Sequence, residues 1–433
     1  MDYIQALDYI HGTWKFGTKL GLENISYLLQ LLGNPHRKPR CIHIAGTNGK
    51  GSVAAMVASI LEKAGYKTGL FISPYLEDFR ERIQINRNYI PKDDLTRLTN
   101  AVKQKVEQML AEGRPHPTEF EVVTAIGFCY FAEQNVDYAV IEVGLGGRLD
   151  STNVIDPLVS VITSVDYDHK DILGDTLAQI AYEKAGIIKP GRPVVVYPQQ
   201  DEAMDVIKQV CQQRQSSLIE VSYSDIEAID DSIDGQHFNY NKGKWTFNRL
   251  YIPLLGKHQL MNAATAITAV LVLREYMGVA ISDKAIPEGL SVTEWPGRLE
   301  LVHRQPYVLL DGAHNPQGAQ SLADAIKNYF PHNRVIMVLG ILADKDVNAI
   351  LEVLVPLAAY IITTRPDSPR AMEAERLLLL VKEMNVQGQA IDSIECAVKT
   401  SLDMAEPDDL VVISGSLYLI GRVRTYLKSV LAH

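Results

Sequence analysis

The chain has 433 residues, a length that exceeds a single compact core and predicts two domains. Hydrophobic residues make up 47% and charged residues 22%, which is typical of a globular enzyme and excludes disordered, collagen-like and fibrous classes. The formal net charge of −10 argues against nucleic acid as a partner, because neutralising phosphates needs a basic face. A small anion is not excluded, since it needs only a few local cations and amide groups.

The chain carries no pattern of an exported or membrane-bound protein. The N-terminus has no basic region followed by an apolar stretch, so no signal peptide is expected. The longest apolar stretch, around residues 263–273, is too short to span a bilayer, and no membrane partner is expected. The cysteines have no paired spacing, which is unlike a disulfide framework or a zinc site and favours a cytoplasmic location: Cys41, Cys129, Cys211 and Cys396.

Short β-branched runs alternate with longer helical patterns, which predicts an α/β fold with a mostly parallel sheet. In chain order we predict a strand at 40–45, a helix at 50–64, a strand at 68–72, helices at 92–112 and 119–134, strands at 138–141 and 158–163, a helix at 177–187 and a strand at 193–196. The polar segment 219–250 is predicted to form antiparallel hairpins rather than another βα unit. A long helix at 258–277 follows.

A domain boundary is predicted at residues 295–298, where Pro296 and Gly297 end a helical pattern. The predicted domains are therefore 1–296 and 297–433. After the boundary the βα rhythm restarts, with strands at 307–311, 335–339, 360–364 and 410–414. We predict a central-sheet domain with a small antiparallel β subregion, followed by a Rossmann-like domain. The second domain has no GxGxxG motif, so no nicotinamide site is expected there.

The sharpest motif lies between a predicted strand and a predicted helix and consists of Gly46, Thr47, Asn48, Gly49, Lys50, Gly51 and Ser52. Glycines let the backbone point successive amides at a phosphate, and the helix N-terminus adds partial positive charge. Lys50 is placed to reach the β- and γ-phosphates, and the Ser52 hydroxyl to hold Mg²⁺. The spacing departs from GxxxxGK[ST], because Ile44 stands where the first glycine would fall. The alternative is a plain strand-to-helix turn, and a nucleotide loop alone equally suits a GTPase switch, a kinase or a ligase.

Three further side chains lie where ligands bind in parallel sheets or near the end of a helix. Glu142 ends an apolar strand, and a carboxylate there suits Mg²⁺; the alternative is a solvated turn. His169 follows the next strand, although a lone histidine is more often structural. Lys184 lies late in an apolar helix that ends at Gly186, and on its own it is best explained as a cation that complements the helix dipole.

Taken together, these residues resemble the folylpolyglutamate synthase and dihydrofolate synthase family, within the Mur-ligase superfamily. The segments that carry the resemblance span nearly the whole chain: the loop 46–52, 73–76, 81–83, 118–124, 142–153, 168–169, 183–187, 258–262, 295–298, 311–316, 344–346 and 414–418. The resemblance implies that the first domain is a P-loop central-sheet ATPase domain. It also implies an ATP-dependent amide ligase with ATP as co-substrate. In that family a folate or dihydropteroate carboxylate is phosphorylated, and L-glutamate then attacks the acyl phosphate.

The resemblance also implies the metal ions and the catalytic residues. Ser52 and Glu142 would hold one Mg²⁺, and Glu142 and His169 a second. The lysine that matches Lys184 is carbamylated in the family, which turns a cation into a carboxylate-like group. The catalytic set would be Lys50, His169, Lys184 and His314.

The remaining site residues come from the same resemblance. Asn262, Arg298 and Asp311 match ATP-contacting positions, although Asn262 could be an interior amide and Arg298 a surface ion pair. His314 and Ser416 match positions on the glutamate side, and Ser73 matches a site-facing position in a loop over the pterin. Arg82 suits a substrate carboxylate but could equally be a solvated charge.

Because these positions fall in both predicted domains, domain closure is expected during catalysis. Two other classes of protein compete with this interpretation. One is a cell-wall Mur ligase, which shares the loop but would need a further recognition domain before it. The other is a nucleotide switch without ligase activity. Within the favoured family the chain is expected to be bifunctional, from the pattern at 146–153, and a monomer.

Overall fold

The computed structural model describes residues 1–17 and 21–430, which divide into two compact units. The first unit comprises Met1–Glu227, Asn239–Leu250 and Met261–Thr293. The second comprises Ala228–Phe238, Tyr251–Leu260 and the chain from Glu294 onwards. Each unit has its own hydrophobic core.

The first unit is built on an eight-stranded sheet in the order β4-β3-β2-β5-β1-β6-β7-β8. Its strands are β1 Arg40–Ala45, β2 Thr68–Phe71, β3 Ile83–Ile85, β4 Asn88–Tyr89, β5 Tyr138–Glu142, β6 Val159–Ile162, β7 Val194–Val196 and β8 Leu218–Glu220. The strands from β2 to β8 in this order pair in parallel, and β3 and β4 add an antiparallel edge. Central β1 is buried on both faces, which explains its nearly continuous apolar sequence.

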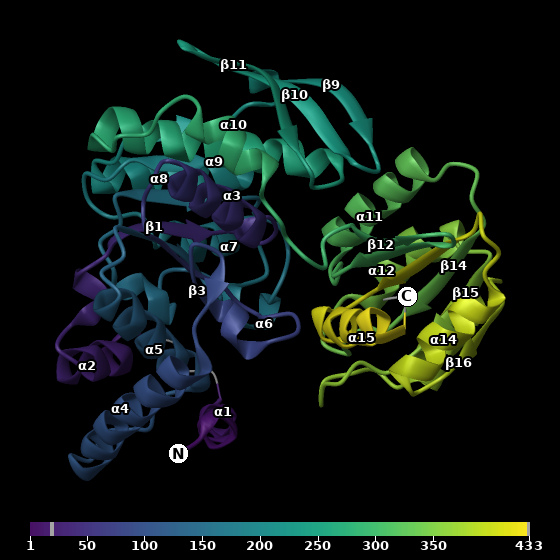
Figure 1. Ribbon diagram of the computed structural model, residues 1–433, viewed down its shortest axis with the longest axis horizontal. Helices are drawn as coiled ribbons and strands as arrows, with labels where there is room; N and C mark the ends of the chain where they lie inside the picture. Colours follow the sequence, from purple (N-terminus) through teal and green to yellow (C-terminus); the bar gives the residue numbers. More distant parts are fainter. Residues whose placement is uncertain (18–20, 431–433) are drawn as a thin grey trace. The chain divides into compact units, whose positions relative to one another are not determined.

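Helices cover both faces of this sheet, with α3 and α10 on the opposite side from α4 and α5 (Figure 1). The helices up to residue 291 are α1 Tyr3–Gly12, α2 Glu23–Leu31, α3 Lys50–Lys63, α4 Lys92–Ala111, α5 Glu119–Glu133, α6 Lys170–Leu173, α7 Leu177–Ala185, α8 Asp201–Arg214, α9 Lys257–Met277 and α10 Ala285–Ser291. Gly289 of α10 allows this helix to pack closely against α3, because a Cβ at this position would meet the backbone of Ile60 at 2.5 Å. This packing fixes the helix that follows the phosphate loop.

A separate three-stranded sheet has the order β11-β10-β9, with β9 Ile226–Ser232, β10 Gly235–Lys242 and β11 Trp245–Ile252. Two-residue links join consecutive strands, so the sheet is antiparallel. The prediction of hairpins is therefore confirmed for most of 219–250. It is wrong for Leu218–Glu220, which pairs in parallel with β7 and completes a βα unit through α8, a helix that the prediction omitted.

The second unit contains a six-stranded sheet in the order β12-β13-β17-β14-β15-β16. Its elements are β12 Glu300–Arg304, β13 Tyr307–Asp311, α11 Pro316–Tyr329, β14 Val335–Leu339, α12 Val347–Leu354, β15 Tyr360–Thr363, α13 Ala374–Glu383, β16 Gly388–Ala390, α14 Ile394–Met404, β17 Leu410–Ser414 and α15 Leu417–Val430. Only β12 is antiparallel to its neighbour. The predicted α/β class and the Rossmann-like second part are confirmed.

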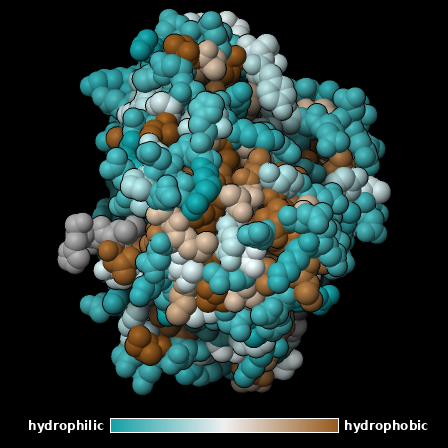
Figure 2. Space-filling model, turned by 90° about the vertical axis from the view of Figure 1, so that its right-hand side faces the viewer, coloured by the Kyte–Doolittle hydropathy of each residue, from teal (hydrophilic) through white to brown (hydrophobic). Residues whose placement is uncertain are grey.

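No helix among the described residues is long and apolar enough to cross a membrane. On the face drawn in Figure 2, hydrophilic residues predominate, and hydrophobic residues form smaller areas between them. The three buried cysteines, Cys41, Cys129 and Cys211, and the exposed Cys396 are all free thiols.

Candidate active site

The phosphate loop joins β1 to α3 and depends on two glycines with positive φ. Gly46 has a φ of 151°, and a Cβ there would overlap the Thr163 hydroxyl. Gly49 has a φ of 87° and occupies the N-cap of α3, where a Cβ would meet the Asn262 amide oxygen at 2.5 Å. Glycine is needed at both positions because of the backbone conformation and the close neighbours. Asn262, predicted to contact ATP, therefore lies beside the loop and is buried.

The chain after β6 supports this loop from one side. The Thr163 hydroxyl donates to the Asn48 carbonyl at 2.7 Å, and the Thr47 amide donates to the Ser164 carbonyl at 2.6 Å. Asn48 and Ser164 form an isolated antiparallel bridge. The loop is thus held both by backbone pairing and by the Thr163 side chain.

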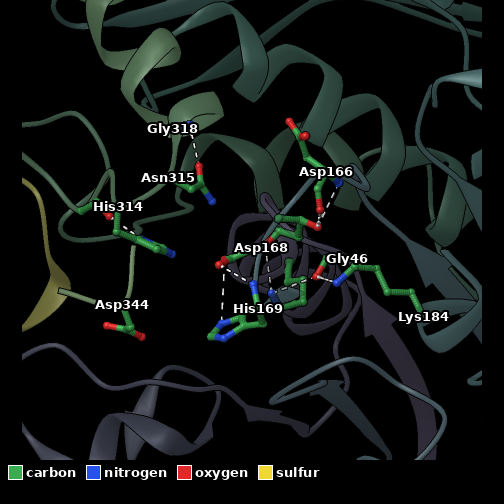
Figure 3. Close-up of polar contacts among 12 residues, drawn as sticks. Gly46, Asp166, Asp168, His169, Lys184, His314, Asn315, Gly318 and Asp344 are labelled. Carbon is green, nitrogen blue, oxygen red and sulfur yellow. Dashed lines mark hydrogen bonds and ion pairs between the residues drawn. The ribbon is translucent and has the colours of Figure 1, made fainter. Parts of the chain in front are cut away.

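Two lysines donate to one carbonyl oxygen of the loop. Lys50 Nζ lies 3.1 Å from Gly46 O. Lys184 Nζ lies 2.8 Å from the same atom (Figure 3). Lys184 is buried, and its pKa is lowered from 10.5 to about 7. Burial is the main cause and the nearby Lys50 charge the second, whereas Asp168 opposes the shift. Lys184 lies in the last turn of α7, where a cation complements the helix dipole, and it is also buried and bound to the phosphate loop.

Glu142 ends β5 immediately beside the strand that leads into the loop, because it pairs with Ile44 of β1. Its side chain is buried and accepts a hydrogen bond from the Ser73 amide at 3.2 Å. The alternative of a strand-end glutamate in a solvated turn is excluded by this burial. The structure thus brings together Glu142 and Ser73, two predicted site residues that are 69 positions apart in sequence.

His169 follows the loop-supporting segment and begins α6. It has a φ of 49°, in the left-handed region that is uncommon for residues other than glycine. Its amide donates to the Asp168 carboxylate at 2.9 Å, and its Nε2 lies 3.8 Å from the same side chain. Figure 3 shows Asp168 and His169 beside Gly46. The imidazole is exposed rather than part of the core.

A buried asparagine that sequence reasoning did not single out connects the segment after Glu142 to the helix of Lys184. Asn153 Nδ2 donates to the carbonyls of Arg148 and Gly186, at 3.0 and 3.1 Å. Gly186 lies against Arg148 so closely that a Cβ would overlap its backbone. Arg148 also pairs with Glu183, at 2.8 Å. In the sequence Asn153 is only one residue of the longer pattern at 146–153, and no periodicity marks its role.

The loop that begins at Ser73 is organised by a carboxylate whose role the sequence did not reveal. Glu81 accepts hydrogen bonds from the amides of Leu76, Glu77 and Asp78 at 2.7–2.9 Å. The guanidinium of the neighbouring Arg82 lies 5.2 Å from the Tyr75 ring centroid and 5.5 Å from that of Phe79. Arg82 is therefore held against aromatic rings and is not a solvated surface charge.

In the second unit, Arg298 and Asp311 come together at the end of β13. Asp311 is buried and accepts from the amides of Leu299 and Ala313, both at 2.8 Å. Burial raises its pKa, and the Arg298 charge opposes this rise. Arg298 also lies 3.4 Å from the Gly312 carbonyl, so it is anchored to the same turn rather than to a surface ion pair.

His314 and Ser416 follow two neighbouring strands of the second unit, because Asp311 of β13 pairs with Ser414 of β17. His314 Nδ1 contacts the Gly312 carbonyl at 2.8 Å and leaves the ring half-buried. Ser416 is buried and accepts from the Tyr418 amide at 3.2 Å, at the start of α15. Asn315, not predicted, caps α11 by accepting from Gly318 (Figure 3).

The donors at the phosphate loop fit a magnesium ion, which the loop motif predicts. Ser52 and Glu142 offer buried oxygen atoms at the phosphate loop, and Mg²⁺ prefers one or two protein oxygens together with phosphate oxygens and water. Within residues 1–17 and 21–430, no group of three or more His, Cys, Asp or Glu side chains forms a metal cage. A divalent cation here would therefore bind together with the nucleotide.

A phosphate loop on a parallel sheet, followed by a second α/β unit, is the arrangement of the Mur ligases. Residues 44–270 match the Mur ligase middle domain, and residues 297–417 match the Mur ligase glutamate ligase domain. The matches include Glu142, His169 and Lys184 in the first range and Arg298, Asp311 and His314 in the second.

Individual relatives narrow the assignment. The chain is 40% identical over 428 residues to the dihydrofolate synthase/folylpolyglutamate synthase of Bacillus subtilis, which covers 98% of this chain and 99% of the relative. It is 34% identical to a folylpolyglutamate synthase of Mycobacterium tuberculosis solved with ADP and AMPPCP, with a TM-score of 0.90 over 98% of each chain. Escherichia coli FolC, solved with DHPP and ADP, is 29% identical, with a TM-score of 0.89 over 100% of this chain and 99% of that one. The chain belongs to the folylpolyglutamate synthase and dihydrofolate synthase family of ATP-dependent amide ligases.

Proposed function

We propose that this protein adds L-glutamate to a folate in two steps, as its family membership implies. A substrate carboxylate oxygen attacks the γ-phosphorus of ATP, which forms an acyl phosphate and releases ADP. The glutamate amine then attacks the acyl carbon, an amide bond forms and inorganic phosphate leaves. One observation carries the proposal: Lys50 and Lys184 both donate to the Gly46 carbonyl of the glycine loop. Buried Glu142 lies beside the strand that leads into this loop.

In this proposal the loop of residues 46–52 binds the phosphates through its amides and Lys50. Ser52 and Glu142 hold one Mg²⁺, and Glu142 and His169 a second. These ions, when bound, offset the charge that develops during phosphoryl transfer. The protein groups act mainly by alignment, because a carboxylate needs only a leaving group and correct placement to become an electrophile.

We propose that Lys184 is carbamylated. A neutral amine attacks CO₂, a nitrogen–carbon bond forms and one proton is released, which leaves a carboxylate. The low pKa of Lys184 supports this reaction, because a large fraction of the amine is neutral near pH 7. Native mass spectrometry with ¹³CO₂ tests it: we expect a labelled carbamate that is absent from Lys184→Ala. An unmodified chain, together with full activity of that variant, would refute the assignment.

The remaining roles are proposed from the family positions and the local geometry of each unit. Asn262 contacts ATP from the first unit, and Arg298 and Asp311 contribute ATP contacts from the second, with Asp311 near the ribose. His314 and Ser416 bind glutamate, with His314 close to the reacting amine. Ser73 and Arg82 bind the folate; the aromatic support of Arg82 favours a fixed guanidinium that pairs with a carboxylate. We place the domain boundary between residues 296 and 297.

One assay tests the reaction and separates the two activities of the family. ADP release is measured with L-glutamate and either dihydropteroate or tetrahydrofolate, and the product is checked by mass for one added glutamate residue. We expect turnover with both acceptors, so the enzyme is dihydrofolate synthase as well as folylpolyglutamate synthase. Turnover with tetrahydrofolate alone would make it a dedicated polyglutamate synthase. ADP release without folate and glutamate would contradict ligase chemistry.

We further propose a monomer in the cytoplasm, serving folate biosynthesis and one-carbon metabolism. Four free thiols favour a reducing compartment, and a ligase with ATP and glutamate as co-substrates needs a compartment that supplies both. Light scattering at assay concentration tests the monomer.

A further inference from the structure

Thr47 lies in the phosphate loop, but its side chain is bound to another segment of the first unit. Its hydroxyl donates to the Asp166 carbonyl at 3.0 Å and accepts from the Asp166 amide at 3.0 Å. A threonine hydroxyl has only one hydrogen to donate. Because Asp166 takes that hydrogen, the Thr47 side chain has none left to give to a nucleotide phosphate.

The segment that Thr47 holds leads directly to His169. Asp166 precedes the histidine by three residues, which span at most about 11 Å when fully extended. Two side chains also bind the backbone within the segment: Asp166 Oδ1 accepts from the Tyr167 amide at 2.7 Å, and Asp168 Oδ1 accepts from the His169 amide at 2.9 Å. The place where Asp166 is anchored therefore limits where the imidazole can lie.

The backbone of His169 needs such support. Its φ of 49° is a conformation that a residue with a Cβ adopts only when its surroundings compensate for the steric strain. The α6 turn after it provides hydrogen bonds on one side, because the Ile172 and Leu173 amides donate to the His169 carbonyl at 3.0 and 2.9 Å. On the other side, the contact with Thr47 fixes the start of the segment.

We propose that Thr47 is a positioning residue that couples the phosphate loop to the metal-binding position of His169. The loop amides hold the phosphates. The Thr47 hydroxyl fixes the position of Asp166, and Asp166 in turn fixes the position of the His169 imidazole relative to these phosphates. This inference rests on the proposed function, in which His169 holds the second metal ion. It differs from a direct role of the Thr47 hydroxyl in nucleotide binding, because the two roles predict losses in different measurements.

The test compares Thr47→Val, which keeps the shape and removes the hydroxyl, with Thr47→Ser, which keeps the hydroxyl. Mn²⁺ binding to the full-length enzyme with saturating AMPPCP is followed by electron paramagnetic resonance, and AMPPCP binding in EDTA by calorimetry. For Thr47→Val we expect Mn²⁺ affinity to fall about tenfold, the factor that one net hydrogen bond produces, and metal-free AMPPCP affinity to change much less. Thr47→Ser should recover most of the Mn²⁺ affinity.

Hydrogen exchange of residues 166–173 gives a readout that does not depend on metal. We expect faster exchange in Thr47→Val and near wild-type exchange in Thr47→Ser. Ser164→Ala is the matched control, because it removes a hydroxyl that donates to the Asn48 carbonyl at 3.3 Å and leaves Asp166 bound. If Thr47→Val does not fold, Thr47→Ala replaces it in the same comparison.

His169→Ala separates the two ways in which the idea can fail. If this variant keeps wild-type Mn²⁺ binding, the proposed metal role of His169 is wrong. If it loses one Mn²⁺ ion while Thr47→Val loses none, only the positioning role of Thr47 is overturned. Equal losses of AMPPCP affinity with and without metal in Thr47→Val would likewise overturn it, and would assign the hydroxyl to nucleotide binding.

Discussion

The substitution Asn153→Ala tests how the site of the first unit is held together. It removes the amide that donates to Arg148 O and Gly186 O, at 3.0 and 3.1 Å, in a buried position. A buried acceptor that loses its donor costs about 1–3 kcal/mol. Two such losses, partly offset by local relaxation, predict that the free energy of unfolding of the first unit falls by about 2–4 kcal/mol.

The measurement must report on the first unit alone. Trp14 and Trp245 belong to it and Trp295 to the second, so urea unfolding is followed by fluorescence in a Trp295→Phe background. Asn88→Ala is the matched control, because its amide also donates to a backbone carbonyl, that of Asn86 at 3.0 Å, but in an exposed position. We expect the control to change the unfolding free energy by less than about 0.5 kcal/mol.

The two variants together decide whether burial sets the energy of the Asn153 contacts. Equal destabilisation by Asn153→Ala and Asn88→Ala would refute the reasoning, and so would a loss below about 1 kcal/mol for Asn153→Ala. Asn153→Asp should be at least as damaging as the alanine variant, because it removes the donor and adds a buried negative charge beside two carbonyls.

Three further changes address the predicted site residues. In CO₂-depleted buffer, where Lys184 carries no carbamate, Lys184→Met should raise the unfolding free energy at pH 7 and lose this gain by about pH 10. The folded pKa of about 7 lies below the ordinary 10.5, so burial of the charged amine destabilises wild type fully below pH 7 and less as the pH rises. A gain independent of pH would contradict this. Gly49→Ala forces a positive φ on alanine and places its Cβ 2.5 Å from the Asn262 amide oxygen. Calorimetry should therefore show ADP affinity at least about tenfold weaker. Unchanged affinity would mean that the loop adapts to the added Cβ. Arg298→Ala should lower kcat/KM for ATP while circular dichroism stays native; unchanged kinetics would exclude an ATP contact.

The central strands and the residues at their ends were predictable from sequence because their physical causes are local. A strand buried on both faces is apolar along its length, and β1 and β5 were recognised in that way. Ligand-binding groups lie at the carboxyl ends of parallel strands, so Glu142 and the phosphate loop followed from the strand positions. The roles of Arg298, Asp311 and His314 came from the family resemblance instead.

Other parts depend on contacts between distant segments and left no local pattern. Strands β3, β4 and β16 have only two or three residues, too few to show a period. Leu218–Glu220 became part of the main sheet because β7 offers a parallel edge, a fact of topology rather than of composition. The binding of three amides by Glu81 and the bridge made by Asn153 each require a turn whose shape is known only after folding.

The net charge of −10 and anionic substrates are compatible because local geometry decides the potential at the phosphate loop. Two ammonium groups share the Gly46 carbonyl, and both burial and mutual repulsion make the charged form of Lys184 less favourable. A polyphosphate bound at the loop adds negative charge beside both lysines and therefore favours their protonated forms. A carbamate on Lys184 would remove one of these cations. Carbamylation would therefore weaken the binding of phosphate at the loop, unless Mg²⁺ supplies the missing positive charge. This balance gives a physical reason for metal ions at a site that already contains two lysines.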